Sequence, residues 1–232
     1  MDASLAEEFG RLAIELHGRR SLSETVDQVV QYALTAVDCD LADVMFLHQG
    51  KLIETVAATD PVAEQAAQLQ ASFGEGPILT MPPEAGSSTV VHDTATDVRW
   101  PRWGGELSDL GIRSVLSIRL ATRDSQIGAL NLYAREPLSF DGDDMAIAHI
   151  LARHASVALA TARREYAVAQ TIDARKRVGL AQGILMERFG LSAEQSFELL
   201  RRYSQEHRLK LNEVARELVA TRELPKKRDL AG

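Results

Sequence analysis

The pattern of apolar residues along the chain changes at Asp141, and this change limits the folds that the chain can adopt. Before Asp141, short runs of apolar or β-branched residues alternate with helical patterns and loops. From Asp141 onward there is no proline until Pro225, and apolar residues recur at spacings of three and four. Helical periodicity without strand patterns predicts a second part made only of helices. We therefore expect an α+β part followed by an all-α part.

The first part is predicted to hold an antiparallel sheet flanked by helices. Helical spacing occurs over residues 5–16, 22–37 and 62–73. Strand patterns occur over residues 44–47, 52–57, 89–91, 114–120 and 126–133. Gln49-Gly50 suits a hairpin turn between the first two strands, and the last two strands can pair across residues 121–125. Residues 74–88 are expected to be a loop, because Gly74-Glu75-Gly76-Pro77 ends the preceding helix.

The second part is predicted to begin with a long connecting helix over residues 141–170. This helix can pack only on its own sheet, or it can also form a dimer interface, and the sequence leaves both possibilities open. Three shorter helices follow, the second of them opened by a capping box at Ser192-Ala193-Glu194-Gln195. Their inner faces are expected to carry Ile172, Val178, Ala181, Leu185 and Phe189; Ser196, Phe197, Leu200 and Tyr203; and Leu211, Val214, Ala215 and Leu218.

Charge is distributed unevenly between the two parts. The net charge is −7, but residues 1–168 carry 13 basic and 24 acidic side chains, whereas residues 169–232 carry 13 basic and 9 acidic ones. An acidic chain would ordinarily argue against a nucleic-acid partner. The basic second part is therefore more informative about the partner than the net charge of the whole chain. We interpret the pattern as an acidic sensor joined to a basic effector, although two differently solvated surfaces would produce it too.

The compartment follows from the N-terminus and from cysteine usage. Met1-Asp2-Ala3-Ser4 has neither a basic segment nor an apolar signal segment, and no apolar run approaches the ~20 residues of a membrane helix. The single cysteine, Cys39, cannot form an internal disulfide. We therefore expect a cytoplasmic protein without a membrane partner.

Four segments of the second part resemble the successive signatures of ANTAR domains. They are Ala181-Gln182-Gly183-Ile184-Leu185-Met186, Ser192 through Phe197, Leu200-Arg201-Arg202-Tyr203-Ser204, and Leu211-Asn212-Glu213-Val214-Ala215. The resemblance covers residues 168–222. It implies a three-helix domain that binds paired RNA hairpin loops and prevents a terminator from forming. Many members have lysine where this chain has Gln182, so this position contributes no charge.

The first part is similar to GAF domains. The similarity rests on Gly74-Glu75-Gly76-Pro77, on residues 97–103, on Ser114-Val115-Leu116-Ser117 and on residues 127–133. It covers residues 20–160 and implies a sensor domain, which we assign to residues 1–160. GAF domains bind widely different ligands, so the cofactor or ligand stays unknown. The proposed organisation is this sensor, a connecting helix over 141–170, the ANTAR domain over 168–222 and a basic tail over 223–232.

Basic and amide side chains of the second part are the predicted RNA contacts. Lysine and arginine neutralise phosphates, and RNA loops expose bases that aromatic or arginine planes can stack upon. The predicted RNA-binding residues are Arg175, Lys176, Gln182, Arg188, Arg201 and Arg202. Gly183 lowers helix stability, so it is expected to allow close helix packing or close approach of RNA, with packing favoured. Tyr203 is expected in the core, with base stacking as the alternative.

Two copies of a small domain are best suited to read two RNA loops, which predicts a homodimer. We expect the 141–170 helix to control it, with a small-molecule ligand of the sensor shifting the helix between two arrangements. Candidate ligand contacts are Arg99, Trp100, Arg102 and Trp103, since two indole rings and two guanidinium groups can close on a flat or anionic ligand. The competing interpretation is that this segment packs its loop onto the sheet.

No catalytic or metal-binding residues are predicted. Cys39 lacks a second cysteine for redox exchange and is assigned to the core, and the histidine pair His149 and His154 is poorly spaced for one helix face. Phosphate loops, nucleophile elbows and paired catalytic carboxylates are absent from the sequence. The alternative function is a small-molecule or redox sensor whose helical tail binds a protein.

Overall fold

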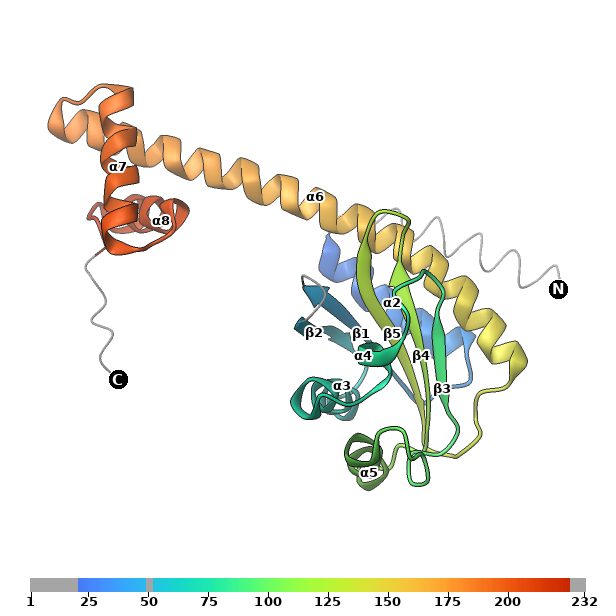
Figure 1. Ribbon diagram of the computed structural model, residues 1–232. Helices are drawn as coiled ribbons and strands as arrows, with labels where there is room; N and C mark the ends of the chain where they lie inside the picture. The colour runs from blue at the N-terminus through green and yellow to red at the C-terminus, as the bar shows by residue number, and fades with distance from the viewer. Residues whose placement is uncertain (1–20, 49–51, 226–232) are drawn as a thin grey trace. The chain divides into compact units, whose positions relative to one another are not determined.

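The computed structural model describes residues 21–48 and 52–225, which divide into two compact units (Figure 1). The first unit extends to Arg164 and the second begins at Glu165. Three predicted features lie outside the described residues: the helix over residues 5–16, the Gln49-Gly50 turn and most of the basic tail. The predicted fold class, α+β followed by a long helix and further helices, is confirmed.

A five-stranded antiparallel sheet forms the centre of the first unit (Figure 1). In spatial order its strands are β2 (Leu52–Ala58), β1 (Leu41–His48), β5 (Gln126–Ala134), β4 (Ser114–Ala121) and β3 (Ser88–Val91). The two predicted hairpins, β1 with β2 and β4 with β5, are both present. Strands β4 and β5 are buried along almost their whole length, because helices cover both faces of the sheet.

One face of the sheet packs against α2 (Leu22–Ala36) and the first part of α6 (Gly142–Phe189). The apolar core on this face includes Val29 of α2, Leu116 and Leu132 of the sheet, and Leu151 and Leu159 of α6. Ser21 starts α2 by accepting a hydrogen bond from the Glu24 backbone N–H. The apolar core on this face contains more buried residues than the core on the opposite face.

The other face packs against α3 (Pro61–Phe73), the short α4 (Pro77–Thr80) and α5 (Pro101–Asp109). Helix α3 ends as predicted, at Gly74 in the left-handed conformation. The prediction of a continuous loop over residues 74–88 was wrong, because Pro77 initiates α4. Helix α5 also differs from the expectation: the sequence predicts a loop around Trp100, but Pro101 occupies the first turn of a helix.

Gly128 of β5 marks a close approach between two central strands. A Cβ atom built on Gly128 would lie 1.7 Å from the carbonyl oxygen of Met45 on β1. Beside this point, the register between β1 and β2 shifts between Val44 and Met45. Only glycine fits there without moving a strand, so the glycine of this sequence motif has a packing reason.

The second unit consists of the end of α6 with α7 (Ala193–His207) and α8 (Leu211–Thr221). The predicted connecting helix and the first of the three helices predicted after it form one continuous helix, α6. The predicted capping box is confirmed, since the Ser192 and Gln195 side chains each accept a hydrogen bond from the other residue's backbone N–H. Helix α8 ends at Thr221, before the predicted limit at Pro225. The buried core of the unit comprises Ala181, Leu185, Leu200, Val214, Ala215 and Leu218.

Three residues predicted on inner faces are exposed. Ile172 and Phe189 of α6 and Phe197 of α7 all present large apolar surfaces outside the core. They occupy the spacing expected of an inner face, but α6 turns its Ala181–Leu185 side inward, and these three side chains lie outside the packed sides of their helices. Tyr203 is half-buried against the core, as expected.

One described helix, α6, is long and apolar enough to pass a length and hydropathy test for a membrane span. The qualifying window has a mean hydropathy of 1.3, and 39% of it is buried inside the structure. The packing of α6 on the sheet accounts for that apolar character. The window is therefore weak support for a membrane helix.

We expect the Gly128→Ala substitution to destabilise the protein by about 2 kcal/mol or more, because the new methyl group must displace the Met45 carbonyl. The free energy of unfolding is measured by urea titration with tryptophan fluorescence. Gly105→Ala in α5 is the matched control, since a Cβ there meets nothing within 4 Å. Equal stability of both variants would contradict the steric explanation.

Candidate functional sites

A buried polar network lies on the sheet face that α3, α4 and α5 cover. The carboxylate of Asp43 accepts hydrogen bonds from Nδ2 of Asn131 at 2.8 Å and from the hydroxyl of Tyr133 at 2.5 Å. Oδ1 of Asn131 in turn accepts a hydrogen bond from Oγ of Ser117 at 2.6 Å. All four side chains are buried, and they link β1, β5 and β4.

Asp43 has no cation among its hydrogen-bond partners. Burial raises the pKa of Asp43 from 3.8 to about 7, although hydrogen bonds from Tyr133 and Asn131 oppose this shift. An unpaired charge inside a low-dielectric core is costly, so the neutral acid is favoured there. Asp43 is not among the site residues predicted from the sequence. The sequence feature that could have indicated it is that Asp43 is the single carboxylate in β1, a strand that is otherwise mostly apolar.

Glu75 joins two of the motifs that the sequence analysis identified. Its Oε2 atom accepts hydrogen bonds from the backbone N–H groups of Arg102 and Trp103, at 3.0 and 3.1 Å. These N–H groups belong to the first turn of α5, where the helix dipole favours a negative charge. The Arg102 guanidinium lies 4.5 Å from the centre of the Phe73 ring. The loop after α3 is thereby held against the start of α5.

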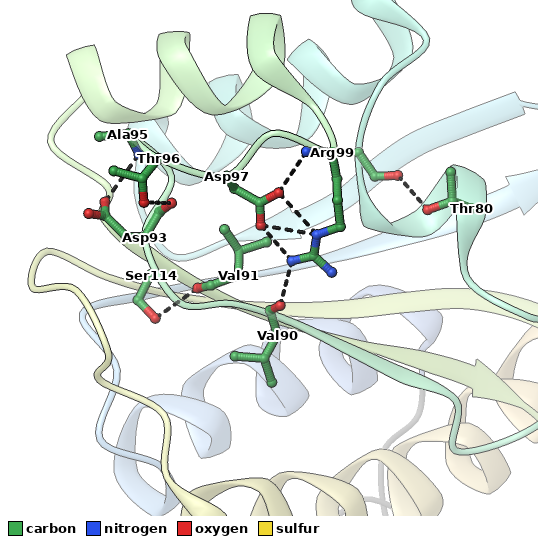
Figure 2. Close-up of polar contacts among 10 residues, drawn as sticks. Thr80, Val90, Val91, Asp93, Ala95, Thr96, Asp97, Arg99 and Ser114 are labelled. Carbon is green, nitrogen blue, oxygen red and sulfur yellow. Dashed lines mark hydrogen bonds and ion pairs between the residues drawn. The ribbon is translucent and has the colours of Figure 1, made fainter.

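The candidate ligand residues of the sensor are engaged in internal contacts. Trp100 and Trp103 are both buried, and their rings meet edge to face at 5.8 Å. Figure 2 shows the contacts of Arg99 with the Asp97 carboxylate and the Val90 carbonyl. Nη2 of Arg99 lies 2.5 Å from Oδ2 of Asp97 and 2.7 Å from the Val90 carbonyl oxygen. In this conformation the indole rings pack the segment onto the sheet, as the competing interpretation expected.

Cys39 and His149 are engaged in contacts with neighbouring residues. Cys39 is partly buried against the larger core, and its Sγ lies 3.7 Å from the Ala33 carbonyl. Burial, together with Asp40, Asp38 and Asp144, raises the pKa of the Cys39 thiol to about 12, so it stays protonated at neutral pH. His149 is hydrogen-bonded to Ser88. Among the described residues, no group of three potential metal ligands occurs.

In the second unit, Gln182 and Arg188 contact the neighbouring helices. Nε2 of Gln182 donates to the Ala193 carbonyl at 3.0 Å, at the start of α7. Nη1 of Arg188 donates to the Arg222 carbonyl at 2.9 Å, at the end of α8. Gln182 therefore has a structural role in this conformation, while the charge of Arg188 stays on an exposed side chain.

The remaining predicted RNA contacts are all exposed, but they differ in their surroundings. Arg201 forms an ion pair with Glu198 at 2.7 Å, and Arg202 forms one with Glu206 at 3.6 Å. Arg175 and Lys176 are exposed on α6, before the packed part of the unit. The structure thus divides the predicted cations between two helices, and those on α7 have acidic neighbours.

Gly183 is not required for packing against the described chain. A Cβ built on Gly183, or on Gly179 one turn earlier, would meet no atom within 4 Å. Close helix packing was the favoured explanation for Gly183, and no helix of the described chain provides such a contact. Both glycines are exposed, so this side of α6 leaves room for the close approach of another molecule.

We expect the free energy of unfolding to fall as pH rises from about 5 to about 7, because folded Asp43 retains a proton that the unfolded chain has lost. Asp43→Asn mimics the neutral acid and should remove this part of the slope. Urea titrations across this pH range measure it. Asp124→Asn, at an exposed position, serves as the control. If the free energy of unfolding of Asp43→Asn changed with pH as it does in the wild type, Asp43 would not be the source of this pH dependence.

Comparison with known proteins identifies both units. A family model of the GAF domain matches residues 19–160, and one of the ANTAR domain matches residues 167–219. No match to the chain was found among curated proteins.

Two solved structures resemble the first unit in fold. A domain assigned to a two-component sensor histidine kinase protein from Sinorhizobium meliloti 1021 is 20% identical, with a TM-score of 0.55, over 65% of this chain and 99% of that one. The GAF domain from a phosphoenolpyruvate-protein phosphotransferase of Coxiella burnetii is 18% identical, with a TM-score of 0.54, over 70% and 96%. The chain therefore belongs to the GAF domain family and carries an ANTAR domain after its GAF domain.

Proposed function

We propose that the protein is a transcription antitermination regulator whose ANTAR domain binds paired hairpin loops in nascent mRNA and prevents a terminator from forming. The two family matches support a sensor-linked regulator of this kind in general. The observation that carries the RNA proposal is the ANTAR match over residues 167–219, a region whose predicted cations are exposed. No covalent chemistry is needed, and the proposed compartment is the cytoplasm.

The cations on α6 and α7 contribute to RNA binding in different ways. Arg175 and Lys176 are available to contact phosphates directly. Arg201 and Arg202 must exchange Glu198 and Glu206 for phosphate. Exposed ion pairs contribute only about 0.2–1 kcal/mol, so this exchange costs little. Gln182 and Arg188 complete the proposed surface, Gln182 after releasing the Ala193 carbonyl.

The functional form is a homodimer formed through α6. Val168, Ile172, Gly179 and Gly183 follow one another at spacings of four, seven and four, so they share one side of the helix. Val168 and Ile172 are more than half exposed, and the two glycines leave open space. A second copy of α6 would cover this stripe and use the close approach that the glycines allow. Two ANTAR domains would then be available for two RNA loops.

The GAF domain regulates this activity by binding a small molecule. A ligand can shift α6 between two arrangements only if it binds them with different affinity. The proposed ligand contacts are Arg99, Trp100, Arg102 and Trp103. The two arginines are exposed, whereas Trp100 and Trp103 can contact a ligand only after the α5 segment opens, because both indole rings are buried. The proposed boundaries are the sensor over residues 1–160, the connecting helix over 141–170, the ANTAR domain over 168–222 and the tail over 223–232.

We expect Arg175→Gln to weaken binding of an RNA with two adjacent short-looped hairpins, and to reduce the slope of log affinity against log salt by about 0.7–0.9. Filter binding at several salt concentrations measures both quantities. Arg123→Gln removes an exposed arginine of the GAF domain and is the matched control. An unchanged slope in Arg175→Gln would remove this residue from the interface.

We expect Ile172→Asp to weaken the dimer by more than about tenfold, because a carboxylate would be buried without a partner. Sedimentation equilibrium measures the dissociation constant. Val98→Asp introduces the same charge at an 88% exposed position of the GAF domain and should leave the dimer intact. The proposed stripe is disproved by a wild-type dissociation constant in Ile172→Asp.

A further inference from the structure

Two phenylalanines of the ANTAR domain are exposed. The Phe189 residue at the end of α6 is 59% exposed, and Phe197 in the second turn of α7 is 37% exposed. Neither belongs to the buried core of the domain. Large aromatic side chains gain most from burial, so two open rings on a small domain indicate a binding surface.

Helical spacing places each ring on the side of its helix that carries one inter-helix contact. Gln182 on α6 donates to the carbonyl of Ala193 on α7 at 3.0 Å. Phe189 lies seven residues after Gln182, and Phe197 lies four residues after Ala193. Residues at these spacings share a helix face, so each ring is on the side of its helix that carries this contact.

Each ring also has an arginine beside it. The Arg188 guanidinium carbon lies 5.7 Å from the centre of the Phe189 ring. Arg201 follows Phe197 by four residues on α7, and its side chain is more than half exposed. An aromatic face with an adjacent cation matches a nucleotide, which presents a flat base and a phosphate. A second copy of this surface would instead bring like charges together.

We propose that Phe189 and Phe197 each stack on an unpaired base of the RNA loops, while Arg188 and Arg201 contact the flanking phosphates. This inference rests on the proposed function and specifies its ligand: the site takes splayed single-stranded loop bases, not the paired stem. Base stacking on an aromatic ring tolerates different bases, so the two rings add affinity with little sequence preference. The cations set the salt dependence separately.

The test uses the full chain and the RNA with two short-looped hairpins. Phe189→Leu and Phe197→Leu keep apolar bulk but remove the ring, and each should weaken binding about tenfold with an unchanged salt slope. Phe197→Trp restores a stacking surface, so it should bind like the wild type. Its additional tryptophan fluorescence should be quenched at saturating RNA. Tyr166→Leu removes another exposed ring from α6 and should leave RNA affinity unchanged.

The outcomes separate this inference from the proposed function. Absence of RNA binding by the wild-type dimer would overturn the proposed function, and the stacking inference with it. Wild-type affinity in both leucine variants, or an unquenched tryptophan at position 197, would overturn the stacking inference alone. A weakened dimer in Phe197→Leu, measured by sedimentation without RNA, would assign the ring to a second copy instead. Thermal unfolding checks that each variant is folded.

Discussion

A single helix, α6, supplies side chains to the cores of both domains. Near its start, Leu151 and Leu159 pack against the sheet, and near its end, Ala181 and Leu185 pack against α7 and α8. Each domain therefore depends on α6 for part of its buried apolar surface. Helices gain most of their stability from such packing. The segment between these two contacts, from residue 161 to 176, is mostly exposed within the chain.

This exposed segment is where the proposed regulation acts. A helix that is packed at both ends but open between them can present a side to a second copy without disturbing either core. Val168 and Ile172 lie on that open part. A change that the GAF domain imposes on the start of α6 then has a direct covalent route to the ANTAR domain, and the proposed dimer stripe lies on this route.

The two domains handle charge in contrasting ways. In the GAF domain, Asp43 is kept in the core through neutral hydrogen-bond partners, and burial raises its pKa toward neutrality. On the ANTAR domain, Arg201 and Arg202 stay at the surface beside glutamates that solvent screens. A buried group of the first kind contributes to folding and its pH dependence. Surface cations of the second kind remain available to a charged partner.

Patterns local in sequence determined the order of the elements and the domain families. The five strands, the Ser192–Gln195 capping box and the helical second part all follow from periodicity and turn chemistry, which act over a few residues. The family signatures likewise depend on local spacing. Helices α4 and α5 were not predicted, because Pro77 and Pro101 usually indicate loops but each begins a helix here.

Only the tertiary structure decided which of these residues meet and which stay open. Helical spacing could not distinguish buried Leu200 from exposed Phe197, because burial depends on how many helices surround each side. The link from Glu75 to the start of α5 and the contact of Asp43 with Tyr133 join residues far apart in the chain. Such contacts exist only once the sheet has paired and its faces are covered, and no local pattern encodes them.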